Sequence, residues 1–161
     1  MLIVDDNHHM VNIVKTILRG LGLKDFFDAR SPIEALELLR TTPVDLIITD
    51  YAMEPVDGFQ FVKKLRAAED NQTRFVPVIM LTAYSEKSRV EAARDSGVNE
   101  FCTKPVTAEE LYKKVRSIVN HPRTFVRTKA YFGPDRRRRD GDHFEGEERR
   151  DADRDETVEL P

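Results

Sequence analysis

The chain has very little cysteine: Cys102 is the single cysteine among 161 residues. One thiol cannot form a disulfide within the chain, and it makes a cysteine-based metal site a poor hypothesis. Long apolar runs are also missing, since the longest lies around "VPVIML" (76–81), far below the ~18 residues that a membrane-spanning helix needs. No basic and apolar leader opens the chain. We therefore expect a cytoplasmic protein that is neither secreted nor inserted into a membrane.

A large net charge is missing as well. The formal net charge is −3, which provides no general attraction to nucleic acid, so DNA is not expected as a partner. The charges are nevertheless dense near the C-terminus, where residues 121–161 contain 10 basic and 11 acidic residues. The length suits one domain with a proper core and an additional segment.

Short apolar segments alternate with amphipathic segments over residues 1–119. The expected strands lie within residues 2–4, 25–29, 44–49, 76–82 and 98–102. The expected helices lie within residues 9–21, 31–42, 57–69, 85–97 and 107–119. Three of the strand segments are continuously apolar, which is typical of parallel strands buried on both faces. The alternation predicts an α/β fold with a doubly wound five-stranded parallel sheet.

Local signals mark the ends of several helices. Ser31 is expected to cap the second helix, with Pro32 at its first position. Thr107 begins the last helix, and Glu110 three residues later completes a capping-box pattern. Gly97 suits the left-handed turn that ends the fourth helix.

Residues 120–161 differ in composition from the rest of the chain. The residues "NHP" (120–122) interrupt the last helix, and few apolar side chains follow Phe132. Such a segment cannot bury enough apolar surface to offset the entropy that ordering would cost. We therefore predict one domain at residues 1–119 and a disordered, flexible charged tail at residues 120–161.

Acidic, hydroxyl and basic residues stand where four of the predicted strands end. Open parallel sheets bind ligands beyond the carboxyl ends of their strands. The residues at these ends are Asp5, Asp6, Asp50, Thr82 and Lys104. Three neighbouring carboxylates repel one another and favour a hard cation such as Mg²⁺. One carboxylate can also become an acyl phosphate, with the metal and the lysine compensating the charge of the transferred group.

Each of these residues also has an ordinary structural explanation when it is taken alone. Asp5 and Asp6 could cap the first helix, and Thr82 could be a β-branched strand residue. Their joint position at the ends of strands one, three, four and five favours a site. His8 and His9 are interpreted as surface residues of the first helix, because no further His or Cys cluster accompanies them.

The motifs "LIVDDN", "LIITDYAMEPVDG", "VIMLTA" and "KP" make residues 1–119 resemble the receiver domain of two-component response regulators, of the CheY-like kind. The resemblance implies a flavodoxin-like receiver fold. It also implies a signalling protein that accepts a phosphoryl group from a histidine kinase or phosphotransfer protein, rather than an enzyme with another substrate. Two departures stand out: the loop reads "MEPVDG", with its proline shifted by one position, and the switch aromatic is Phe rather than Tyr.

The resemblance also assigns roles to single residues. Asp50 would be the phosphoacceptor, Thr82 the switch hydroxyl, Phe101 the switch aromatic and Lys104 the contact of the phosphoryl group. The Lys104–Pro105 peptide bond would be cis. The Mg²⁺ ligands would be Asp5, Asp6, Asp50 and the backbone carbonyl of Ala52, with Asp6 as a direct ligand.

Four consecutive arginines distinguish the tail segment "YFGPDRRRR". Guanidinium groups form bidentate bonds to phosphate and to the edge of guanine. The segment resembles the arginine-rich extension of CheY-like proteins that bind cyclic di-GMP and act on motility or attachment. That resemblance implies a flagellar motor or another protein as target, and a nucleotide site made of Tyr131, Gly133, Pro134, Arg136, Arg137, Arg138 and Arg139, with Tyr131 or Phe132 as stacking surface.

Two other interpretations of the arginines stay open. One is an inert, solvated tail on a plain phosphorelay receiver, because the neighbouring aspartates partly neutralise the run. The other is contact with nucleic acid, for which the segment offers no accompanying stacking platform or groove-reading helix.

Overall fold

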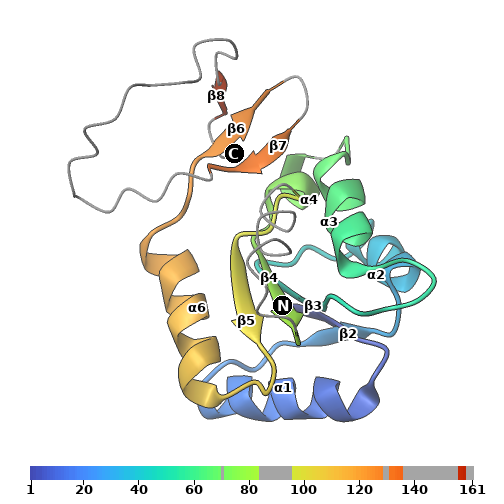
Figure 1. The fold of residues 1–161 in the computed structure, drawn as a ribbon, viewed down its shortest axis with the longest axis vertical. Coiled ribbons are helices and arrows are strands. Elements are labelled where there is room, and N and C mark those ends of the chain that lie inside the picture. Colours follow the sequence, from blue (N-terminus) through green and yellow to red (C-terminus); the bar gives the residue numbers. More distant parts are fainter. Residues whose placement is uncertain (70, 84–95, 129–130, 136–155, 159–161) are drawn as a thin grey trace.

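The computed structural model describes residues 1–69, 71–83, 96–128, 131–135 and 156–158. Its centre is a five-stranded sheet in the order β2-β1-β3-β4-β5, and all of its strand pairs are parallel (Figure 1). The strands are β1 (Leu2–Val4), β2 (Phe27–Ala29), β3 (Ile47–Asp50), β4 (Val78–Thr82) and β5 (Glu100–Thr103). The predicted fold class, an α/β domain with a doubly wound five-stranded parallel sheet, is confirmed.

Helices cover both faces of this sheet (Figure 1). On one face pack α1 (His8–Gly20) and α6 (Ala108–Asn120), and on the other pack α2 (Pro32–Leu39) and α3 (Gly58–Arg66). Side chains alternate between the two cores along a strand, so that Ile3 faces α1 and α6 whereas Leu2 and Val4 face α2 and α3. No helix in the described part of the chain is long and apolar enough to cross a bilayer.

The predicted helix caps are present. The Oγ atom of Ser31 accepts a hydrogen bond from the backbone N–H of Glu34, and Thr107 caps α6 in the same way, both at 3.2 Å. Asn7 caps α1, so neither Asp5 nor Asp6 serves as its N-cap. Gly97 has a φ of 92°, the left-handed conformation that its predicted role requires. The helix expected at residues 85–97 lies outside the described residues, apart from its last two positions.

The chain continues beyond α6 into a second, small sheet. Its strands are β6 (Phe125–Arg127), β7 (Phe132–Pro134) and β8 (Glu156–Val158), paired antiparallel in the order β7-β6-β8. We call residues 123–128 and 131–135 the arm; Figure 1 shows it in orange beyond the end of α6. Phe125, Val126 and Tyr131 are buried, with 2%, 6% and 8% of their surface exposed. The predicted disorder of the tail is therefore wrong for the arm, whereas residues 136–155 lie outside the described residues.

Aromatic packing explains why the arm folds. Phe75, at the end of the short helix α4 (Asn71–Phe75), contacts Phe125 and Phe132 with ring centroids 5.0 and 5.5 Å away. Aromatic pairs in this range add stabilisation beyond the area that they bury. The composition of the whole tail hid this cluster, because its apolar residues are gathered in the first third and the charged residues follow. The division of the chain at residues 119 and 120 stays a prediction.

A buried arginine joins the arm to the domain. The guanidinium of Arg66 donates hydrogen bonds to four acceptors, the backbone oxygens of Arg74, Val76 and Gly97 and the side-chain oxygen of Asn99, at 2.7–3.1 Å. Its Cζ atom also lies 5.1 Å from the ring centroid of Phe125. Burial lowers the pKa of Arg66 to about 9, so the group stays charged at neutral pH. The arm thus covers the guanidinium of Arg66, which extends from α3 to the residues that precede β4 and β5.

Replacing Phe125 with alanine is expected to destabilise the protein by about 3 kcal/mol, because a fully buried ring leaves a cavity beside Arg66. Urea unfolding followed by circular dichroism measures the change. The matched control is Val119→Ala, whose side chain belongs to a residue that is 71% exposed, and its effect should stay below about 0.5 kcal/mol. Equal unfolding midpoints for Phe125→Ala and the wild type would show that the arm does not pack on the domain in solution.

Candidate functional site

The predicted site residues meet at the carboxyl edge of the central sheet. Asp5 follows β1, Asp50 and Thr82 end β3 and β4, and Lys104 follows β5. Because these strands are parallel, all of these positions lie on the same edge. Carboxylate oxygens of Asp5, Asp6 and Asp50 lie within 4.8 Å of one another. The structure therefore brings together the three acidic residues that the sequence placed at separate strand ends.

Asp50 and Lys104 are in direct contact. The Nζ atom of Lys104 lies 2.9 Å from Oδ2 of Asp50, and Oδ1 accepts a hydrogen bond from the backbone N–H of Tyr51 at 2.7 Å. The backbone N–H of Lys104 donates to the carbonyl of Thr82 at 2.8 Å, which places the lysine at the end of β4. The Lys104–Pro105 bond is cis, as predicted. A fixed cation thus stands at one oxygen of a carboxylate that is 5% exposed.

Asp5 is a buried carboxylate with an incomplete set of partners. Its Oδ1 atom accepts a hydrogen bond from the backbone N–H of Asn7 at 2.8 Å. Its Oδ2 atom accepts no hydrogen bond from the described residues, and Lys104 Nζ lies 3.9 Å from it. Burial raises the pKa of Asp5 to about 6; the charges of Asp50 and Asp6 also raise it, whereas the Asn7 hydrogen bond and Lys104 lower it. An ionised Asp5 therefore lacks full compensation.

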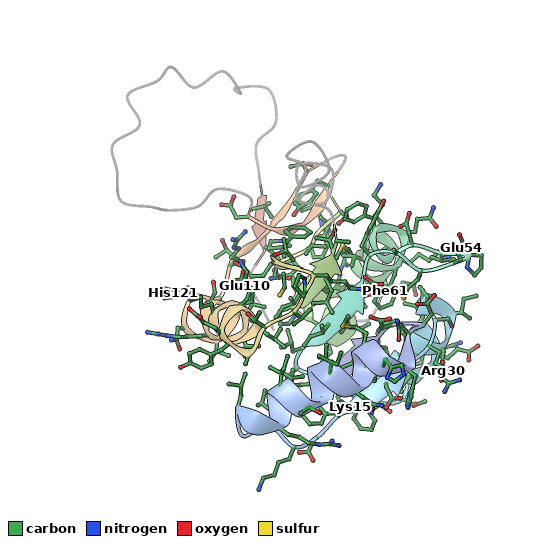
Figure 2. The ribbon with its side chains drawn as sticks, turned by 60° about the horizontal axis from the view of Figure 1, so that its bottom comes forward. Lys15, Arg30, Glu54, Phe61, Glu110 and His121 are labelled. Atoms are coloured by element: carbon green, nitrogen blue, oxygen red, sulfur yellow. The ribbon has the colours of Figure 1, made fainter. Side chains whose placement is uncertain are left out.

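This donor set fits a divalent cation. Mg²⁺ binds oxygen ligands and usually retains several waters beside one or two carboxylates. Asp5 offers an oxygen that accepts no hydrogen bond from the described residues, Asp6 is exposed, and Asp50 completes the acidic group. Ala52 lies in the exposed loop after β3, which also contains a cis Glu54–Pro55 bond; Figure 2 shows Glu54 on the outside of the molecule. Three carboxylates facing one lysine leave an excess of negative charge that a cation would balance.

The predicted switch residues lie on adjacent strands. Thr82 pairs with Thr103 in the register of β4 and β5, and Phe101 pairs with Met80. Thr82 is 8% exposed at the edge where the carboxylates meet. Phe101 is half-buried and packs against the core beneath α2 and α3. Their role in switching stays a prediction.

Gly58 is a site residue that the sequence analysis did not single out. A Cβ atom at this position would lie 2.3 Å from the backbone oxygen of Asp50 and 3.1 Å from the terminal methyl of Met80. The backbone N–H of Gly58 donates to the carbonyl of Tyr51 at 2.9 Å. The loop after β3 can therefore close onto α3 only because residue 58 has no side chain. Residue 58 ends the motif "LIITDYAMEPVDG", but the motif did not reveal this close approach.

The predicted nucleotide residues of the tail fall into two groups. Tyr131, Gly133 and Pro134 belong to the arm and are buried. The hydroxyl of Tyr131 donates a hydrogen bond to the backbone oxygen of Pro134 at 2.8 Å, so this ring packs within the arm instead of presenting an open stacking face. Phe132 is half-buried, and its ring centroid lies 4.0 Å from Cζ of Arg74. Residues 136–139, the arginine run, lie outside the described residues.

The two histidines near the site lie on the surface. His8 and His9 are exposed in the first turn of α1. His8 Nε2 contacts the side-chain nitrogen of Asn12 at 3.1 Å. In the part of the chain that the structure describes, the acidic group that could hold a metal contains no histidine. This agrees with their interpretation as surface residues.

Comparison with known proteins identifies the family of the domain that contains this site. The model of the response regulator receiver domain matches residues 1–116. Chemotaxis protein CheY-3 of Vibrio cholerae is 36% identical over 118 residues, which span 73% of this chain and 89% of that protein. Chemotaxis protein CheY1 of Helicobacter pylori J99 is 36% identical over 120 residues, 74% of this chain and 95% of that protein.

Solved structures show the same similarity. CheY4 of Vibrio cholerae superposes with a TM-score of 0.66 at 29% identity, covering 73% of this chain and 95% of that chain. The receiver domain of the sensor histidine kinase PA1611 from Pseudomonas aeruginosa PAO1 has a TM-score of 0.65 at 27% identity, covering 74% and 95%. The latter structure contains a magnesium ion coordinated in its active site cleft.

Replacing Gly58 with alanine is expected to destabilise the protein by about 2 kcal/mol, because the new methyl group displaces the backbone of Asp50. Urea unfolding measures this loss. Gly20→Ala is the matched control, since a Cβ atom at Gly20 meets nothing within 4 Å, and the substitution in α1 should stabilise the protein by up to about 1 kcal/mol. A neutral effect of Gly58→Ala would contradict the close approach described above.

Proposed function

The chain belongs to the response regulator receiver family of two-component signalling, and from this premise we propose that Asp50 accepts a phosphoryl group in the presence of Mg²⁺. The contact between Lys104 Nζ and Asp50 Oδ2, 2.9 Å long and beside two further carboxylates, is the observation that carries the proposal. Lys104 alone would neutralise one of the three carboxylates. The remaining negative charge would attract the metal ion on which the proposed phosphoryl transfer depends. The donor would be a histidine kinase or a phosphotransfer protein.

The proposed transfer needs little from the protein beyond positioning and charge. An oxygen of Asp50 forms a bond to phosphorus while the bond from phosphorus to the donor imidazole nitrogen breaks, and the leaving imidazole takes up a proton. Lys104 holds one Asp50 oxygen and would pair with the transferred group as it arrives. Asp5 and Asp6, with Asp50 and the carbonyl of Ala52, would hold Mg²⁺, which supplies charge compensation for the phosphoryl oxygens.

The proposed output is a change at the receiver surface rather than the turnover of another substrate. Thr82 stands at the carboxyl edge and Phe101 lies on the adjacent strand, which supports the proposal that both respond to a group on Asp50. A protein target, such as a flagellar motor component, would read that surface. The proposed location is the cytoplasm, where a histidine kinase presents its phosphoryl group.

A second candidate function is the binding of cyclic di-GMP by the arginine run. The supporting observation is that the arm is folded and ends at a fixed place: the backbone N–H of Asp135 donates to the carbonyl of Thr124 at 2.7 Å. The run at residues 136–139 begins directly after this hydrogen bond. Its guanidinium groups suit the two phosphates and two guanines of the dinucleotide.

Asp50→Asn is expected to abolish phosphorylation, because an amide oxygen is a far weaker nucleophile than a carboxylate oxygen. The measurement is incorporation of label from a small phosphodonor with Mg²⁺. Asp45→Asn, which removes one exposed carboxylate elsewhere, should retain labelling at the wild-type rate. Label on the Asp50→Asn protein would show that another residue is the acceptor.

Changing Arg136–Arg139 to alanine is expected to abolish calorimetric binding of cyclic di-GMP and to leave phosphorylation of Asp50 unchanged. The control changes Arg149 and Arg150 to alanine, which removes two arginines from the same tail and should weaken binding by less than threefold. If the wild-type chain binds no dinucleotide, the tail has no sensing role of this kind, and the protein is a receiver driven only by phosphorylation.

A further inference from the structure

A cavity of about 100 Å³ lies where the arm meets the receiver domain. Pro77 and Asn99 line it and directly precede β4 and β5, so it stands at the end of the sheet opposite to Asp50. Its apolar walls include the rings of Phe75 and Phe125 and the side chain of Ile118. Pockets with mainly apolar walls and a few converging polar groups are the usual form of small-molecule sites.

Glu100 is the carboxylate of the cavity wall, to which Arg123 also belongs, and the proposed phosphorylation does not involve it. The residue is 6% exposed and lines the cavity. Its carboxylate contacts Arg123 Nη2 at 3.2 Å, Ser117 Oγ at 3.3 Å and Lys114 Nζ at 3.5 Å. Charge-assisted bonds to a carboxylate are usually about 2.7–2.9 Å long. Among the described residues, the donors around Glu100 therefore form only hydrogen bonds and ion pairs of 3.2–3.5 Å, longer than that range.

A ligand could supply the short bonds that Glu100 lacks. A carboxylate accepts about four hydrogen bonds, and burial makes weak hydrogen bonding costly. The rings of Phe75 and Phe125, with centroids 5.0 Å apart at an angle of 74°, form an apolar corner beside it. A planar heterocycle would pack in that corner. Two adjacent N–H donors on its edge would reach the two carboxylate oxygens.

We propose that this cavity binds a planar heterocycle with adjacent N–H donors, as on the N1 and N2 edge of guanine, with Glu100 as the acceptor. Adenine fits less well, because its corresponding edge presents a lone pair at N1 toward the carboxylate. Figure 2 shows α6, which supplies Ser117 and Ile118 and ends before the labelled His121, another residue of the wall. The base would thus be held between the last helix and the arm.

The arm links this cavity to the part of the sequence that holds the arginine run. Phe125, which lines the cavity, pairs with Pro134 in the small sheet. The hydrogen bond from Asp135 to Thr124 then fastens the last described residue of the arm beside Phe125. In the sequence, the arginine run at residues 136–139 follows this residue directly, and its guanidinium groups would suit the phosphates of a nucleotide. The choice of cyclic di-GMP as the biological ligand of this cavity rests on the second candidate function proposed above.

Calorimetric titration of the full chain with GMP, AMP and cyclic di-GMP tests the inference. We expect GMP to bind at least tenfold more tightly than AMP, and Glu100→Gln to weaken binding of both guanine ligands at least tenfold. Glu110→Gln is the matched control, because Glu110 contacts Lys114 at 3.5 Å as Glu100 does but lies outside the cavity wall. That variant should bind within threefold of the wild type.

A second variant keeps the test independent of the charge of Glu100. Ser117→Leu places a larger side chain in the cavity wall and should abolish GMP binding while keeping the Glu100 carboxylate, which retains its contacts with Arg123 and Lys114. Thermal unfolding and circular dichroism confirm that each variant is folded. Loss of GMP binding in both Glu100→Gln and Ser117→Leu, with Glu110→Gln unaffected, is the expected result.

The other outcomes separate this inference from the proposals on which it builds. If cyclic di-GMP binding requires Arg136–Arg139 but tolerates both cavity variants, the tail is a sensor and the cavity inference is wrong. If GMP binds through Glu100 and cyclic di-GMP binds no more tightly, the cavity inference holds and the dinucleotide proposal fails. If neither guanine ligand binds the wild-type chain, both fail, and labelling of Asp50 still decides the receiver function.

Discussion

The parallel alignment of β1, β3, β4 and β5 is the constraint on which the rest of this structure depends. Parallel strands place all of their carboxyl ends on one edge, so residues far apart in the sequence meet there. Asp5, Asp50 and Lys104 approach within hydrogen-bond or ion-pair distance for this reason. The same alignment gathers the opposite ends of β4 and β5 around Arg66, Asn99 and the arm.

Both ends of the sheet bury charge, and at each end one carboxylate has missing or long contacts with the described residues. At the carboxyl edge, Oδ2 of Asp5 has no hydrogen bond from the described residues. At the other end, the contacts of Glu100 with described residues are 3.2–3.5 Å long, whereas each guanidinium nitrogen of Arg66 donates a hydrogen bond at 2.7–3.1 Å. Folding free energy alone disfavours such groups, so departures of this kind point to ligands. The well-bonded Arg66 is structural by the same criterion.

The arm adds a second, chemically distinct region to the receiver domain. A receiver with a disordered tail would present the rings of Phe75 and Phe125 to water. Here these rings pack on each other and on Phe132, and the arm closes the cavity that contains Glu100. The protein therefore has two chemically distinct places. One is the acidic edge of the sheet, suited to a metal and a phosphoryl group. The other is the cavity between the arm and the domain, whose aromatic and polar wall suits a planar ligand.

The sequence by itself determined the five strands of the central sheet, the helices α1, α2, α3 and α6, and the residues of the acidic edge, but not α4 or the small sheet. These are local signals, because periodicity and strand ends can be read along the chain, as at Asp50 and Lys104. Tertiary structure alone decided the roles of Gly58, Arg66 and Glu100. At Gly58, a Cβ atom would lie only 2.3 Å from the backbone oxygen of Asp50. The partners of Glu100 come from α6 and from the arm. Such contacts between distant segments leave no pattern in a single sequence, which is also why the packing of the arm was missed.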